Sequence, residues 1–176
     1  MKPVLPVLLA MLVLSGSTAT QARAPETPNL LSLGAGSFDV LKNEPRNRAA
    51  DFRLEYRFGE ADALLHLGSH VSLRPWVGAE VTSDGGLYGG GGLFLDLELG
   101  PLAITPSFGA GLHRDGGGKR LGSSMEFRST IEVAYRFENE SRLGVAFGHI
   151  SNGGLTSLNP GVEVVTVYWH MPVDWL

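Results

Sequence analysis

Residues 87–99 read Leu-Tyr-Gly-Gly-Gly-Gly-Leu-Phe-Leu-Asp-Leu-Glu-Leu, and this stretch decides the fold. From Leu87 onward every second residue is leucine or glycine, and the residues between them are aromatic, acidic or glycine. Successive side chains of a β-strand point to opposite faces. The alternation therefore predicts a strand with one apolar face and one face of polar and small residues.

The same alternation returns along the chain, whereas no helical periodicity of useful length is found. We expect strands over Leu31–Phe38, Ala50–Phe58, roughly Leu73–Thr82, Leu87–Leu99, Leu102–His113, Met125–Phe137, Arg142–Ser151 and Gly161–Met171. Eight strands form the smallest common closed barrel, so the sequence predicts an all-β fold, an eight-stranded antiparallel barrel. The span Gly59–Ser72 is left open as strand, turn or a short extra element.

The size of the side chains decides which face of the barrel points outward. Small residues crowd the polar face: Gly78, Gly90, Gly92, Ala103, Ser107, Gly109, Gly111, Ala134, Gly144, Ala146 and Gly148. They suit a tight lumen better than a hydrated exterior. Beyond residue 24 the only lysines are Lys42 and Lys119, both in expected loops, whereas a water-facing sheet normally carries more charge. We therefore expect a transmembrane β-barrel with its apolar face toward lipid.

Loop lengths give the orientation, because bacterial barrels have short periplasmic turns and longer exterior loops. Gly100-Pro101 and Glu138–Ser141 are tight, whereas Asp39–Ala49, Arg114–Leu121 and Asn152–Pro160 are long. The loop after Ser151 is therefore expected outside the cell. A periplasmic aromatic belt on the lipid face is expected from Tyr56, Phe58, Tyr135, Phe137 and Trp169.

Residues 1–24 have the pattern of a secretory signal peptide. Lys2 precedes an apolar run from Pro6 to Leu14, and the segment ends on Ala22-Arg23-Ala24. We expect cleavage after Ala24, one barrel domain over residues 25–176, and location in the bacterial outer membrane. The remaining chain has 12 cationic side chains against 18 acidic ones and no cysteine. A nucleic-acid surface, a disulfide and a Cys-ligated metal are therefore not expected.

Three reactive side chains interrupt the apolar outer face near its exterior end. The outward series of the penultimate strand reaches His149 and Ser151, and that of the last strand begins with Glu163. A hairpin with Ser151 opposite Gly161 sets His149 opposite Glu163, with their Cβ atoms about 4.5–5.5 Å apart. An imidazole between a carboxylate and a hydroxyl can activate a serine nucleophile.

Asn152 follows Ser151 directly and supplies an amide donor, and Gly153-Gly154 supplies unhindered N–H groups. Such donors can form an oxyanion hole. The competing interpretation is that the polar residues only bond to one another or to lipid headgroups. The protein would then be a non-catalytic structural or surface-interaction barrel. A periplasmic lipid-binding barrel is a third, weaker hypothesis.

The segment His149-Ile-Ser-Asn-Gly-Gly-Leu155, followed by Asn159-Pro-Gly-Val-Glu163, resembles the signature of the lipid A 3-O-deacylases of PagL type. The resemblance implies a serine esterase with Ser151 as nucleophile, His149 as base and Glu163 as its orienting acid. It also implies that Asn152 and the Gly154 amide form the oxyanion hole. The implied substrate is the 3-position ester of lipid A in lipopolysaccharide, within outer-membrane lipids, with neither metal nor cofactor. One departure is that the chain continues past Trp169, where such barrels commonly end on an aromatic residue.

Other candidate sites have weaker patterns. His66, His70 and His113 lack the spacing of metal ligands, and Gly89–Gly92 lacks the Gly-Lys-Ser/Thr of a phosphate loop. An exterior cluster of Arg114, Lys119 and Arg120 fits lipid phosphates and an ordinary solvated loop equally well. The sequence leaves the acyl-chain preference and the oligomeric state open, a homodimer included.

Charges on the lumen face are expected to form an ion-paired plug, because side chains fill the interior of an eight-stranded barrel. These charges are Asp51, Arg53, Glu55, Arg57, Asp96, Glu98, Glu126, Arg128, Glu132 and Arg136.

Overall fold

The computed structural model describes residues 27–41 and 47–173. Its strands are β1 (Asn29–Phe38), β2 (Ala49–Arg57), β3 (Leu65–His66), β4 (Val71–Thr82), β5 (Leu87–Leu99), β6 (Leu102–Arg114), β7 (Met125–Arg136), β8 (Arg142–Ser151) and β9 (Val162–Val173). A short 3-10 helix, η2, covers Glu60–Asp62. The expected signal peptide lies outside the described residues, as does Lys42.

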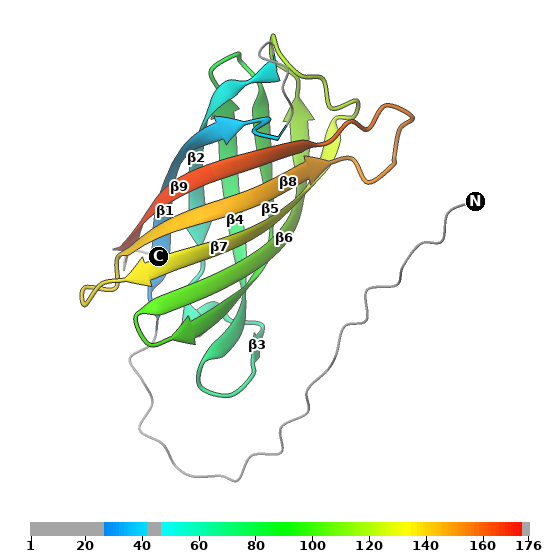
Figure 1. Ribbon diagram of the computed structural model, residues 1–176. Helices are drawn as coiled ribbons and strands as arrows, with labels where there is room; N and C mark the ends of the chain where they lie inside the picture. The colour runs from blue at the N-terminus through cyan, green and yellow to red at the C-terminus, as the bar shows by residue number, and fades with distance from the viewer. Residues whose placement is uncertain (1–26, 42–46, 174–176) are drawn as a thin grey trace.

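Eight of these strands close into an antiparallel barrel (Figure 1). Strands β4 to β9 pair in chain order, and β1 pairs with both β2 and β9. Pairing of β2 with β4, with Leu54 opposite Ala79, completes the circle. The predicted eight-stranded all-β barrel is confirmed.

The span Gly59–Ser72, which the sequence left open, holds η2 and the short β3. β3 pairs with β4 alone, with Leu65 opposite Leu73, and projects from one end of the barrel as a small arm (Figure 1). Within the two described ranges, no helix is long and apolar enough to cross a membrane.

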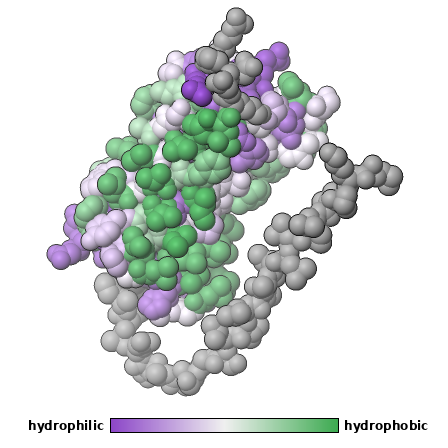
Figure 2. Space-filling model, in the orientation of Figure 1, coloured by the Kyte–Doolittle hydropathy of each residue, from purple (hydrophilic) through white to green (hydrophobic). Residues whose placement is uncertain are grey.

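The outer wall of the barrel is apolar. Figure 2 shows hydrophobic side chains over the strands that face the viewer in Figure 1, β6 to β9. Large apolar residues are exposed there, including Phe108, Ile131, Val145 and Val167. An exposed apolar band around a closed barrel is the signature of a lipid-facing wall. The transmembrane prediction is confirmed.

The expected aromatic residues cluster at the end of the barrel where the short turns lie. Tyr135 and Phe137 have ring centroids 5.0 Å apart, and Phe137 and Trp169 are 5.7 Å apart. The rings of Tyr56 and Phe58 meet edge to face at 4.9 Å. These contacts support the assignment of this end to the periplasm.

Glycines on the inner face make room for two buried aromatic rings. A Cβ on Gly109 would lie 2.5 Å from Cζ2 of Trp76, and one on Gly111 would lie 2.6 Å from Cζ of Tyr88. A side chain at either glycine would therefore overlap a ring. The small residues of the polar face do line a tight lumen, as predicted.

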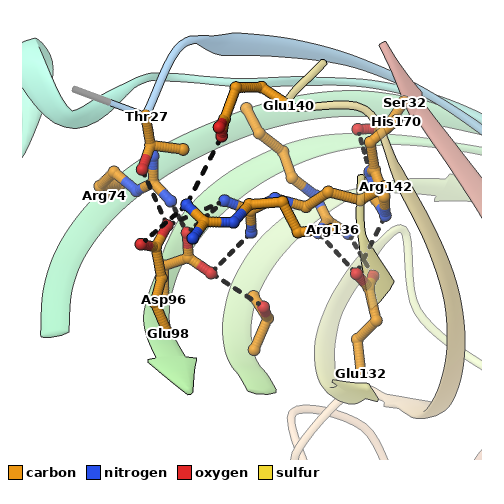
Figure 3. Close-up of polar contacts among 12 residues, drawn as sticks. Thr27, Ser32, Arg74, Asp96, Glu98, Glu132, Arg136, Glu140, Arg142 and His170 are labelled. Carbon is orange, nitrogen blue, oxygen red and sulfur yellow. Dashed lines mark hydrogen bonds and ion pairs between the residues drawn. The ribbon is translucent and has the colours of Figure 1, made fainter. Parts of the chain in front are cut away.

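Buried ion pairs fill the rest of the lumen. Arg57 lies 2.8 Å from Glu132 and 3.2 Å from Glu55, and Arg142 lies 2.9 Å from Asp96. Figure 3 shows the periplasmic part of this network, where Asp96 faces both Arg74 and Arg142. The predicted ion-paired plug is confirmed except at Glu126, whose two carboxylate oxygens are buried with no hydrogen-bond partner among the described residues. Four of its members were missed by the sequence analysis: Arg74, Glu80, Arg142 and His170.

The residues after Trp169 continue strand β9. His170 points into the lumen, where Nδ1 lies 2.7 Å from Ser32 Oγ and Nε2 lies 2.9 Å from Glu132 Oε1 (Figure 3). The β1–β9 ladder runs on until Val173 pairs with Asn29. Trp169 is therefore an internal residue of the last strand. Residues 174–176 lie outside the described range.

Candidate active site

The candidate site lies on the hairpin of β8 and β9, near the exterior rim. His149 pairs directly with Glu163, as the sequence register predicted. Their side chains meet on the outer wall, with Nδ1 of His149 3.2 Å from Oε1 of Glu163. The His149 side chain is 44% exposed, while that of Glu163 is 18% exposed. The carboxylate is thus shielded beside a more accessible imidazole.

Strand alternation fixes this placement. The residues between the candidate site residues point inward, and Ile150, Val162 and Val164 are buried with Phe38, Ala49 and Leu121 in one apolar cluster. Turning either strand over would expose that cluster to solvent or lipid and bury the charges. Packing inside the barrel therefore holds His149 and Glu163 outside.

Ser151 is the last residue of β8, half-buried, and pairs with Phe127 of β7. Among the described residues no hydrogen bond joins its hydroxyl to His149. Since Nδ1 of His149 faces Glu163, its other ring nitrogen, Nε2, is the one available to a hydroxyl. Catalytic contacts of this kind often tighten only when substrate binds.

Gly161 sets the position of the imidazole. Its φ of +59° is in the left-handed region, and a Cβ there would lie 2.7 Å from Cε1 and 3.2 Å from Nε2 of His149. The edge of the ring that carries Nε2 therefore points toward the end of the hairpin where Ser151 lies. A glycine at this position satisfies both the backbone conformation and the close approach.

Asn152 is fully buried and holds the exterior loop together. Its Nδ2 lies within hydrogen-bond distance of the carbonyl oxygens of Leu158 (2.8 Å) and Leu121 (3.2 Å) and of Thr156 Oγ1 (3.0 Å). Its Oδ1 accepts a hydrogen bond from the N–H of Gly154 at 3.0 Å. The structure therefore brings the two expected oxyanion donors together, but bonds them to the loop and to each other.

The loop between β6 and β7 supports the site from inside, which sequence reasoning missed. Leu121 is fully buried under the exterior end, and Lys119 Nζ lies 2.5 Å from Asp39 Oδ1. Lys119 thus faces inward to an acid. Arg120, with 77% of its side chain exposed, remains at the surface. In the sequence, the signal for this buried support was Leu121, a single leucine within a charged, glycine-rich loop.

The remaining histidines stand apart from the site. His113 Nε2 lies 3.2 Å from Asp115, and His66 lies 3.7 Å from Glu60. In residues 27–41 and 47–173 no group of three or more potential ligands is placed to hold a metal ion.

The fold and the outward-facing histidine–carboxylate contact define this protein as an eight-stranded outer-membrane β-barrel with a candidate site on its lipid-facing wall. The chain belongs to the lipid A 3-O-deacylase (PagL) family, whose model matches residues 48–172.

Two curated relatives are similar over shorter segments. The chain is 35% identical over 57 residues to the lipid A deacylase PagL of Pseudomonas aeruginosa, covering 32% of this chain and 33% of that protein. It is 34% identical over 47 residues to the lipid A deacylase PagL of Bordetella bronchiseptica, covering 27% of this chain and 26% of that protein. The matched segments span a third or less of each relative.

Solved structures agree on the fold over most of the chain. The crystal structure of the outer membrane enzyme PagL matches with a TM-score of 0.64 and 18% identity, covering 82% of this chain and 99% of that one. A de novo designed transmembrane β-barrel matches with a TM-score of 0.52 and 12% identity, covering 86% and 100%. At these identities the matches support the barrel fold alone.

Proposed function

We propose that this protein is a serine esterase that removes the 3-O-linked acyl chain from lipid A in the outer leaflet, with Ser151, His149 and Glu163 as its catalytic residues. The observation that carries the proposal is the 3.2 Å contact between His149 and Glu163 on the lipid-facing wall, with Ser151 two positions along the same face. A carboxylate on such a wall is unfavourable without a compensating role. Family membership supports the substrate class.

In the first half of the reaction, Nε2 of His149 takes the proton of the Ser151 hydroxyl as Oγ attacks the ester carbonyl carbon. Glu163 holds the imidazole through Nδ1 and stabilises its protonated form. When the tetrahedral intermediate collapses, the bond to the sugar oxygen breaks and His149 returns the proton to that oxygen. The products are a deacylated sugar hydroxyl and an acyl-serine.

In the second half, His149 takes a proton from water as the water oxygen attacks the acyl-serine. Collapse releases the fatty acid and returns the proton to Ser151. We assign stabilisation of the negative oxygen to Asn152 and the Gly154 N–H. Because both donors are bonded within the loop in the structure, this role requires the loop to release at least one of them when substrate binds.

The position of the site suits a substrate that never leaves the membrane. His149 and Ser151 lie beside the exterior loops, where the outer leaflet meets the barrel, and the surface below them is apolar. An ester near the sugar of lipid A would sit at this depth while its chains remained among neighbouring lipids. No extraction of the lipid into a pocket is required.

The test is the lipid A composition of cells that express the protein or its Ser151→Ala variant. We expect wild-type protein to reduce the mass of lipid A by one hydroxyacyl group, and Ser151→Ala to abolish that loss while retaining heat-modifiable barrel mobility. Ser157→Ala, an exposed serine of the same loop, is the matched control and should behave as wild type. Unchanged deacylation by Ser151→Ala would remove Ser151 from the mechanism.

The alternative function is a non-catalytic barrel that presents its loops at the cell surface. It would be favoured if wild-type protein, correctly folded in the outer membrane, left the mass of lipid A unchanged.

A further inference from the structure

Ser129 is a second polar interruption of the lipid-facing wall, directly beside His149. It lies on β7 and pairs with His149 on β8, so that Ser129, His149 and Glu163 form one row across three strands. The Ser129 side chain is exposed on the outer face. Direct cross-strand neighbours have Cβ atoms about 4.5–5.5 Å apart.

Apart from His149, the direct neighbours of Ser129 on the outer face are apolar. They are Phe108 across the β6–β7 ladder, and Phe127 and Ile131 along β7. Phe108 and Phe127 stack with centroids 6.0 Å apart. The small serine is therefore flanked by larger apolar side chains and by the imidazole.

The Ser129 hydroxyl has no hydrogen-bond partner within the part of the chain that the structure describes. A hydroxyl that faces hydrocarbon without a partner is unfavourable. A chemical group on the bound lipid that accepts or donates a hydrogen bond would relieve this cost. Ser129 adjoins the candidate catalytic residue His149, so such a group would belong to the substrate.

The path of the acyl chain follows from the placement of the catalytic residues. From an ester held at Ser151, the chain must run down the wall toward the middle of the bilayer. On the β9 side, His149 and Glu163 are in contact and occupy the surface that the chain would have to cross. On the β7 side the chain can cross Ser129 and continue over the apolar Ile131.

We propose that Ser129 binds the hydroxyl group on the third carbon of the departing acyl chain and so selects hydroxyacyl over unsubstituted esters. This inference rests on the proposed function. Ser129 and Ser151 are diagonal neighbours across the β7–β8 ladder, a separation of about 7–8 Å. An acyl carbonyl bonded to Ser151 Oγ, a hydroxyl two carbons farther along and one hydrogen bond of about 2.8 Å span a distance of that order.

The experiment compares two diacylated glucosamine 1-phosphates in detergent micelles, which differ only in the 3-O-linked chain, (R)-3-hydroxytetradecanoyl or tetradecanoyl. The full-length protein is expected to hydrolyse both, with a higher kcat/KM for the hydroxyacyl ester. Ser129→Ala should lower kcat/KM for the hydroxyacyl ester about five- to tenfold, the effect of one hydrogen bond, and leave the other ester unchanged. Ser129→Thr, which retains a hydroxyl, should restore the preference.

Ser37→Ala is the matched control, because Ser37 is also an exposed serine on the outer face but lies on β1, opposite Val165. It should hydrolyse both esters as wild type does. An equal loss on both esters in Ser129→Ala would mean that Ser129 acts through His149 and would overturn the proposal, as would no loss on either. Wild-type protein that hydrolyses neither ester would instead overturn the proposed function, and the inference with it.

Discussion

At the scale of single residues, the candidate site depends on two side chains that share one rung of the β8–β9 ladder. The register places His149 and Glu163 opposite each other, and the outward parity of both strands turns them to the same face. Oε2 of Glu163 is buried with no hydrogen-bond partner among the described residues. Among the described residues the His149 imidazole is therefore the side-chain partner of the carboxylate. Removal of the Glu163 carboxylate should therefore affect the reaction through His149.

Replacement of Glu163 by alanine should leave partial activity, because this carboxylate orients and stabilises the base but does not attack the ester. We expect kcat to fall about 10²- to 10⁴-fold with KM little changed. Steady-state hydrolysis of purified lipid A in micelles measures both constants. Barrel folding, checked by heat-modifiable mobility, should persist, and a variant that cannot fold would favour a structural role for Glu163.

At the scale of elements, the junction between the exterior loop and β9 positions the imidazole. Residues 152–161 leave β8 through buried Asn152, which is bonded to the carbonyl oxygens of Leu121 and Leu158. The loop rejoins the barrel through Gly161, whose Cα faces the ring of His149. The loop is therefore fixed at both ends to structure that surrounds the site.

Gly161→Ala should impair the reaction without removing a reactive group. The new Cβ would collide with His149, and a displacement of the ring by about 1 Å is expected to reduce kcat about 100-fold. The left-handed backbone adds about 1–2 kcal/mol of destabilisation. Activity assays combined with urea unfolding measure the two effects.

The Gly85→Ala variant separates the loss of stability from the loss of activity. Gly85 has a φ of +88° in an exterior turn, and a Cβ there would contact nothing within 4 Å. This control should show the loss of stability alone. Equal activities of the two variants would contradict the positioning role of Gly161.

At the scale of the whole molecule, the barrel inverts the arrangement of a soluble domain, with its apolar residues outside and its charges inside. Glu132 is central to that interior, because it faces Arg57 at 2.8 Å and His170 at 2.9 Å from two other strands. Each of these buried charges needs a partner of opposite charge within the network. Removal of one member leaves its partners buried and unpaired.

We expect Glu132→Ala to destabilise the barrel by about 3–5 kcal/mol, as measured by urea unfolding in lipid vesicles. Activity of the folded fraction should be retained, since Glu132 points to the inner face. Glu98→Ala removes an acid at the partly exposed end of the same network and should cost less than about 1 kcal/mol. A similar cost for both variants would show that burial does not set the strength of the network.

Local pattern accounts for what could be predicted from the sequence. Strand bounds agree closely, with Leu87–Leu99 and Arg142–Ser151 reproduced in full, because side-chain alternation is a property of the strand itself. β8 and β9 are consecutive strands joined by one loop, which limited the possible registers, so the pairing of His149 with Glu163 was also accessible. The family resemblance rested on the same short segment.

Contacts between residues far apart in the chain could not be predicted. Alternation placed Asp51 and Arg57 on the inner face, but not the bonds that join Arg57 to Glu132 or Tyr168 to Glu55. It also gave no sign that Lys119 would turn inward to Asp39. The sequence by itself determined the strands, their faces and the outward trio of Ser151, His149 and Glu163, because these follow from the geometry of one strand and its neighbour. Only the tertiary structure decided the pairing of lumen charges and the anchoring of Asn152 on Leu121, because closing the barrel brings together strands and loops that the chain keeps apart.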